Sequence, residues 1–122
     1  MLIAYWIVAA ILAFFYLYSG GSKVVRSREQ LRPMMGWVDR TPAGIVKLIG
    51  LLEVLGAIGL ILPPLTGIAP WLAIVAASGL VAVQIGGIIV HVSRGELKII
   101  GLNIGALVLA AVAVWLAASQ FA

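Results

Sequence analysis

Four long runs of apolar residues alternate with short polar or proline-rich stretches along this chain of 122 residues. As helices that rise about 1.5 Å per residue, runs of this length cross the roughly 30 Å hydrocarbon core of a bilayer. The pattern predicts four transmembrane helices in a single transmembrane domain, residues 1–122. Because Met1 to Tyr18 carries no charge, we expect the first run to be a retained helix and not a cleaved signal peptide. The predicted helices cover about residues 2–23, 42–62, 70–93 and 98–120.

The second predicted helix begins at a threonine–proline pair and ends at a pair of prolines. Thr41 is a good N-cap, and Pro42 suits the first helical turn. Pro63 and Pro64 predict that this helix ends at Leu62, because proline lacks the N–H that continues a helix.

The composition also requires an apolar solvent. The chain is 64% hydrophobic and 10% charged, whereas soluble domains are roughly 45–50% apolar and 25% charged. The absence of cysteine excludes disulfides and thiolate metal sites, and with one histidine and four acidic residues we expect no metal site and no covalently bound cofactor. We assign the net charge of +4 to contact with the lipid bilayer and not with nucleic acid, because basic loops beside transmembrane helices face the anionic cytoplasmic leaflet.

All eight basic residues lie on one side of the predicted bundle. Under the positive-inside rule, the first and last connections face the cytoplasm and both termini lie outside. Short connections make consecutive helices antiparallel neighbours. The predicted fold is therefore all-α, an integral membrane up-down bundle of four helices, and we expect a multi-pass protein of the plasma membrane. The basic residues are Lys23, Arg26, Arg28, Arg32, Arg40, Lys47, Arg94 and Lys98.

Residues 24–41 form the polar cytoplasmic connection of this prediction. Charged residues alternate there with apolar ones, a pattern that fits a short surface helix interrupted at Pro33 and equally fits a solvated loop. Aromatic rings at the two ends of the first helix, Tyr5 with Trp6 and Tyr16 with Tyr18, are expected at the membrane interfaces.

Glu53 is the strongest candidate for a functional residue. It lies about 16 Å from the cytoplasmic end of its helix, at about 1.5 Å per residue, and so near the middle of the membrane. Its helical neighbours are Ile49, Gly50, Gly56 and Ala57, of which three are small. Because small residues form close helix contacts in membranes, we expect Glu53 to point into the bundle.

Four other polar residues are predicted to share the cytoplasmic half of the bundle with Glu53. His91 and Gln84 lie seven residues apart on one helix face, and Asn103 lies on a stripe of small residues. Lys23 closes the first helix. We therefore expect a polar chamber open, or nearly open, to the cytoplasm. The alternatives are that Gln84 and Asn103 only join helices, that His91 reaches the interface, and that Lys23 is an interfacial anchor.

The chain resembles the DoxX-like family of small four-helix membrane proteins. Three motifs carry the resemblance: Ser19-Gly20-Gly21-Ser22-Lys23, the block from Gly50 to Pro63 around Glu53, and His91 followed by Ser93-Arg94-Gly95-Glu96. The resemblance implies a four-helix bundle with an important carboxylate in the membrane, for which Glu53 is the match. Some members of this family are membrane subunits of a thiosulfate:quinone oxidoreductase, and others are thought to join membrane-associated redox assemblies, so the resemblance implies a similar role for this chain.

These observations lead to a first functional hypothesis, a subunit of a membrane-associated redox assembly that binds a quinone- or lipid-like ligand. Without cysteine or a metal set the chain cannot carry electrons alone, so we do not expect a stand-alone enzyme. The partner is expected to be a larger membrane protein complex or further copies of the chain. The alternative is a structural accessory subunit without a ligand, and a carrier ranks below both because no internal repeat is present.

Overall fold

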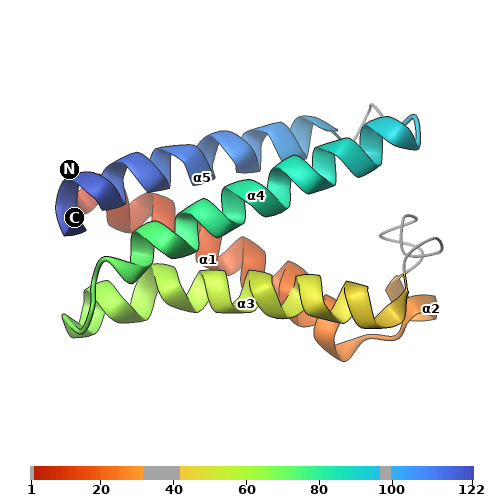
Figure 1. Ribbon diagram of the computed structural model, residues 1–122, viewed down its shortest axis with the longest axis horizontal. Helices are drawn as coiled ribbons and strands as arrows, with labels where there is room; N and C mark the ends of the chain where they lie inside the picture. Colours follow the sequence, from red (N-terminus) through yellow and green to blue (C-terminus); the bar gives the residue numbers. More distant parts are fainter. Residues whose placement is uncertain (1, 32–41, 97–99) are drawn as a thin grey trace.

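The computed structural model describes residues 2–31, 42–96 and 100–122. The described residues form five helices and no strand. Four of these helices are long and apolar enough to cross a membrane. The prediction of an all-α bundle with four transmembrane helices is confirmed (Figure 1). The helices are α1 (Leu2–Val25), α2 (Arg28–Leu31), α3 (Ala43–Thr66), α4 (Leu72–Ser93) and α5 (Ile100–Phe121).

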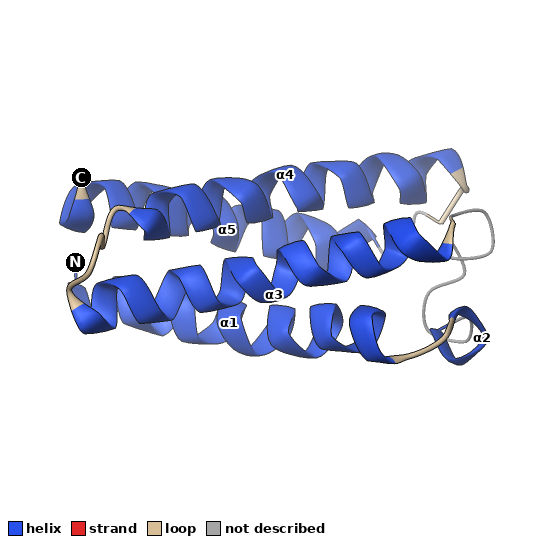
Figure 2. Cartoon of the chain, turned by 60° about the horizontal axis from the view of Figure 1, so that its bottom comes forward, coloured by secondary structure: helices blue, strands red, loops and turns tan. Residues whose placement is uncertain are grey.

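The long helices form an up-down bundle in which each packs against two neighbours. α1 contacts α3 and α5, and α4 contacts the same two helices from the other side. Consecutive long helices run in opposite directions, so both ends of the chain lie at one end of the bundle (Figure 2). We call the opposite end, which carries Lys23, Arg26, Lys47 and Arg94, the basic end.

Large apolar side chains cover the outside of the bundle. Phe14 is 80% exposed, and Ile3, Ile68 and Leu102 are similarly open on other parts of the surface. Small and aromatic residues fill the interior, including Ala9, Ala77, Ala110 and Ala113. Exposing these apolar side chains to water would cost much free energy, whereas lipid tails are apolar themselves and accept them without that cost. The chain is a multi-pass membrane protein.

The predicted cytoplasmic connection is described only in its first part. A capping box starts α2, because Ser27 and Gln30 exchange backbone and side-chain hydrogen bonds of 2.9 and 3.3 Å. Leu31 then turns inward and is buried. This favours the surface-helix interpretation for residues 28–31, while the predicted interruption at Pro33 lies outside the described residues.

Helix α3 does not end at Leu62 as predicted. It continues through Pro63 and Pro64 to Thr66 and ends at Gly67, whose φ of 74° is left-handed and whose N–H donates to the Pro63 carbonyl over 3.0 Å. Glycine accepts this conformation without the strain that a side chain would cause.

A tertiary hydrogen bond explains how α3 tolerates its second proline. Pro64 has no N–H, so the carbonyl of Leu60 loses its helical donor. The hydroxyl of Tyr5 on α1 donates to that carbonyl over 2.6 Å. Because the contact is buried, this hydroxyl replaces a donor that water cannot supply.

Two of the tyrosines that were expected at the membrane interfaces are buried between the helices. Tyr5 and Tyr16 are fully buried and hydrogen-bonded inside the bundle. Tyr18, in contrast, is 60% exposed. Helix α1 continues to Val25, which places Tyr16 more deeply than the apolar run alone suggested.

Candidate functional site

The closest approach of α1 and α3 lies at two glycines. A Cβ atom on Gly20 would stand 2.5 Å from the carbonyl oxygen of Gly50, and a Cβ atom on Gly50 would stand 2.5 Å from the Cβ of Lys23. Neither position can hold a side chain unless the helices separate. This contact places Lys23 on α1 opposite Glu53 on α3.

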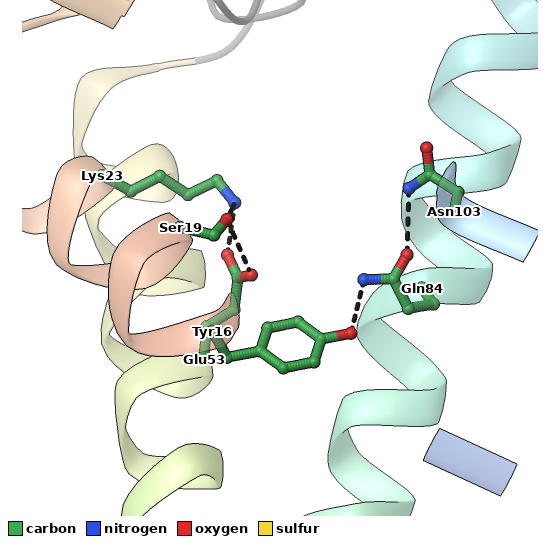
Figure 3. A network of polar contacts seen from close by, with 6 residues as sticks. All are labelled: Tyr16, Ser19, Lys23, Glu53, Gln84 and Asn103. Atoms are coloured by element: carbon green, nitrogen blue, oxygen red, sulfur yellow. Dashed lines mark hydrogen bonds and ion pairs between the residues drawn. The ribbon is translucent and has the colours of Figure 1, made fainter. Parts of the chain in front are cut away.

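Lys23 and Glu53 form a buried ion pair at this crossing, with Ser19 between them (Figure 3). The lysine ammonium donates to Glu53 Oε1 and to Ser19 Oγ, the latter over 2.9 Å. The serine hydroxyl in turn donates to Glu53 Oε2 over 3.2 Å. Glu53 is only 2% exposed and Lys23 only 7%. We call these three residues the ion-pair cluster.

Helix direction explains why Lys23 points inward. Side chains in a helix lean toward its N-terminus, which for α1 is the end remote from the basic end. The same rule tilts Glu53 of α3 toward the basic end, so the two charges meet. Lys23 is thus buried against Glu53, and its alternative role as an interfacial anchor stays a prediction.

A second set of polar side chains joins α1, α4 and α5. Asn103 Nδ2 donates to Gln84 Oε1 over 2.9 Å, and Gln84 Nε2 donates to the hydroxyl of Tyr16. Figure 3 shows the Tyr16 ring reaching from α1 toward Gln84 on α4, with Asn103 beyond it on α5. Tyr16 and Gln84 are buried. We call these three residues the amide chain.

His91 lies apart from both clusters, at the end of α4. Its Nδ1 is 3.3 Å from Glu96 Oε1, and Arg94 Nε donates to the same oxygen over 2.7 Å. The backbone closes the helix beneath them, since the Glu96 N–H donates to the His91 carbonyl and Gly95 has a left-handed φ of 72°. The hydrogen bond from Arg94, followed by that from His91, lowers the pKa of Glu96.

The five candidate residues thus fall into three places. Lys23 and Glu53 contact each other, Gln84 and Asn103 contact each other, and His91 pairs with Glu96. Direct contacts join the buried members of each pair, and the chamber open to the cytoplasm stays a prediction.

Sequence reasoning missed Ser19, Tyr16 and Glu96 as members of these sites. Ser19 and Tyr16 could have been predicted, because residues 16, 19, 20 and 23 share one face of a helix and so lie on the same side as Lys23. Glu96 follows the left-handed Gly95, and its return toward His91 depends on that backbone turn.

Two apolar grooves lie on the outer surface of the bundle. One, of about 660 Å³, runs between α3 and α4 and is lined by residues such as Gly56, Gly59 and Gly79. The other, of about 410 Å³, runs between α1 and α5 and is lined by residues including Phe15 and Gly105. The five candidate residues line neither groove.

Comparison with known proteins gives one match. The sequence matches the DoxX-like family over residues 7–114, a range that contains the ion-pair cluster, the amide chain and the end of α4. No curated protein and no solved structure gave a match. The order of the motifs, the four spans and this match agree, and the chain belongs to the DoxX-like family as a small integral membrane protein.

Proposed function

We propose that this protein is a subunit of a membrane-associated redox assembly, in the plasma membrane, and that it binds a quinone- or lipid-like molecule in the half of the bundle nearest the basic end. The observation that carries the proposal is the buried ion-pair cluster. Each charged residue at the centre of a membrane helix costs roughly 2.5–3.5 kcal/mol on insertion scales.

A buried ion pair is by itself a weak reason for stability. Apolar residues of similar volume often replace a buried ion pair with no loss of stability, or with a gain of about 1–4 kcal/mol. We therefore infer that Lys23 and Glu53 serve a function besides holding α1 against α3. Intramembrane charges commonly serve ligand binding and proton movement.

The donors in the interior fit a ligand that bears a carbonyl group. Lys23 can donate only, Ser19 and Tyr16 carry hydroxyls, and all three face the bundle interior from α1. Bound quinone would supply the redox chemistry, and its reduction needs two protons and two electrons. Lys23, Ser19 and Glu53 can hold protons near such a ligand, while a partner protein must supply the electrons.

The proposal is tested by the molecules that the protein retains. The protein is purified from its native membrane in mild detergent, and its organic extract is analysed for quinones and other ring-bearing lipids by mass spectrometry. We expect quinone with the wild type and with Lys47→Met, which removes an exposed lysine. We expect its loss in the double variant Lys23→Met/Glu53→Leu. Equal amounts in the double variant, or none in the wild type, would overturn the proposal.

A second candidate, a structural accessory subunit without a ligand, is favoured by one observation. Gln84 and Asn103 already have protein partners, as membrane helices joined by polar side chains would. This function predicts a stoichiometric membrane partner that co-purifies equally with the wild type and the double variant, and an organic extract without quinone.

A further inference from the structure

The turn between α3 and α4 exposes large apolar side chains at the end of the bundle opposite the basic end (Figure 2). Ile68 is 73% exposed, and Leu65 and Trp71 are each more than half exposed. We call residues 65–71 the apolar turn. Asparagine, aspartate and serine, the polar residues common in turns, are absent from it, and the sequence contains no charged residue from position 54 to position 90. This composition favours an apolar surrounding over water.

Hydrogen bonds within the apolar turn and its flanks use up many of its polar groups. The N–H groups of Gly67, Leu72 and Ile74 each donate over 3.0 Å to a carbonyl three or four residues earlier. The hydroxyl of Thr66 donates to a carbonyl of α3 over 2.8 Å, and Pro70 has no N–H. Lipid tails offer polar groups no partner, so backbone that touches them needs partners within the protein. These contacts bring the turn close to that requirement.

The length of α3 places the apolar turn at the far boundary of the hydrocarbon core. Near the basic end of α3, the exposed Lys47 donates its ammonium to the Val24 carbonyl over 2.8 Å, and an exposed charge of this kind marks the near boundary. Thr66 lies nineteen residues further along the helix, which is about 28 Å at about 1.5 Å per residue. The hydrocarbon core is about 30 Å thick, and any tilt of α3 shortens the span across it. The turn therefore stops at the lipid boundary.

Two exposed tryptophans lie in the same half of the bundle. Trp71 precedes α4, Trp115 lies near the end of α5, and both side chains are more than half exposed. Since α4 and α5 run in opposite directions, both rings lie in the half that holds the chain termini (Figure 1). Indole rings concentrate at membrane interfaces, where the ring meets lipid and the N–H meets water. Helices α4 and α5 thus each indicate an interface near the apolar turn.

We propose that the apolar turn anchors the bundle by inserting into the leaflet opposite the basic end, with Leu65 and Ile68 among the acyl chains and Trp71 at the headgroup boundary. The occupant of this surface is lipid, because the turn continues the lipid-facing exterior of α3 and α4, where Leu62 and Leu72 are also exposed. Charged residues hold the basic end at one interface, and the apolar turn holds the other end at the second. This inference goes beyond the proposed function and does not depend on it.

Spin labels measure the depth of the apolar turn directly. The chain contains no cysteine, so single-cysteine variants of the full chain carry a nitroxide without background labelling. Power saturation in phosphatidylcholine nanodiscs compares collisions with oxygen, which concentrates in lipid, and with nickel ethylenediaminediacetate, which stays in water. We expect the oxygen-to-nickel ratio to be about tenfold higher for Ile68→Cys than for Glu29→Cys, equal to about 1.4 kcal/mol in the partition of the probes. Phe14→Cys, exposed in the middle of α1, gives the value for a lipid-facing site.

Two results of this measurement would overturn the inference. A ratio for Ile68→Cys equal to that for Glu29→Cys places the turn in water. Low accessibility to both probes means that protein covers the turn, either a partner or a second copy of the chain.

Fluorescence tests whether Ile68 holds the turn in the lipid. Trp71 is left as the single tryptophan by replacing Trp6, Trp37 and Trp115 with phenylalanine, and the lipids carry bromine on their acyl chains as a quencher. Aspartate is costly in hydrocarbon, so Ile68→Asp should draw the turn toward water and reduce the quenching of Trp71 by about half. Val25→Asp, at an exposed apolar position near the basic end, should leave the quenching unchanged. Absent quenching in the parent, or equal quenching in the two aspartate variants, would refute the anchor.

Discussion

Replacing Tyr5 with phenylalanine removes one hydroxyl from the interior and leaves the ring in place. The hydroxyl donates to the carbonyl of Leu60, which has no helical donor because Pro64 lies four residues further on. The ring contacts with Trp6 and Phe121, at centroid separations of 5.4 and 4.9 Å, do not need the hydroxyl. The substitution therefore isolates the hydrogen bond from the packing.

The expected cost follows from leaving a buried carbonyl without a donor. Such a loss is worth about 1–3 kcal/mol, and interhelical hydrogen bonds in membrane proteins are worth about 0.6–2 kcal/mol, so we expect Tyr5→Phe to lower the free energy of unfolding by about 1–2 kcal/mol. Pro64→Ala supplies a backbone N–H to Leu60. In that background Tyr5→Phe should cost less than about 0.5 kcal/mol, the usual range of a neutral substitution.

The free energies of unfolding are measured by titration with sodium dodecyl sulfate in mixed micelles, followed by far-ultraviolet circular dichroism. Wild type, both single variants and the double variant form a double-mutant cycle. Pro63→Ala is the matched control, because its N–H would reach Gly59 and leave Leu60 without a donor. An equal cost of Tyr5→Phe with and without Pro64 would refute the coupling between the proline and the tyrosine.

Three further predictions concern the other contacts. Gly20→Ala should lower the free energy of unfolding by about 1–3 kcal/mol in the same titration, because its Cβ would stand 2.5 Å from a backbone oxygen of α3. Lys23→Met should cost about 3–5 kcal/mol by leaving the Glu53 carboxylate buried without its cation, and adding Glu53→Leu should recover most of that loss. The pKa of Glu96 is lowered from its ordinary value of 4.5, so its ionised contacts stabilise the end of α4 at neutral pH and are lost as the pH falls through that lowered pKa. Amide hydrogen exchange at the end of α4 should therefore be faster in Glu96→Gln than in the wild type at pH 7, and the difference should vanish in acid.

Each of these predictions has a control in the same chain. Gly21→Ala adds a methyl group where nothing lies within 4 Å, so it should be neutral or stabilise by up to about 1 kcal/mol through helix propensity. Lys47→Met removes an exposed lysine whose ammonium donates to the Val24 carbonyl over 2.8 Å, and the loss of this exposed hydrogen bond should cost no more than about 1 kcal/mol. Glu29→Gln should leave hydrogen exchange at the end of α4 unchanged. Equal effects of Gly20→Ala and Gly21→Ala would contradict the close crossing, and a difference at Glu96 that persists in acid would contradict the ionised contact.

The spans and their antiparallel order could be predicted from hydropathy alone. Each apolar run is long enough to cross the membrane, and the two short connections, which flank α4, leave little choice of neighbour there. The inward direction of Glu53 was also predictable, because Gly50, Gly56 and Ala57 surround it on the helix and small residues mark close contacts.

The hydrogen-bond partners of the buried polar groups could not be predicted, because they lie on other helices, far away in the sequence. The end of α3 was predicted at Leu62 because proline removes a local hydrogen bond, but a tyrosine 55 residues away replaces the donor at Leu60. In the same way, the assignment of Tyr16 to an interface followed from an expected helix end, whereas its hydroxyl meets Gln84 of α4. In both places a hydrogen bond between helices adds a contact that the local rule does not contain.

Helix α1 links the two buried polar clusters mechanically. Ser19 and Lys23 face Glu53 on α3, while Tyr16, one turn earlier on the same helix, faces Gln84 on α4. Rotation of α1 about its axis would therefore break contacts in both clusters, and the close approach at Gly20 leaves little room for it to slide. The register of α1 fixes both sets of contacts, so a substitution that displaces α1 should disturb the ion pair and the amide chain together. A change that acts only within α4 and α5 should reach the amide chain and spare the ion pair.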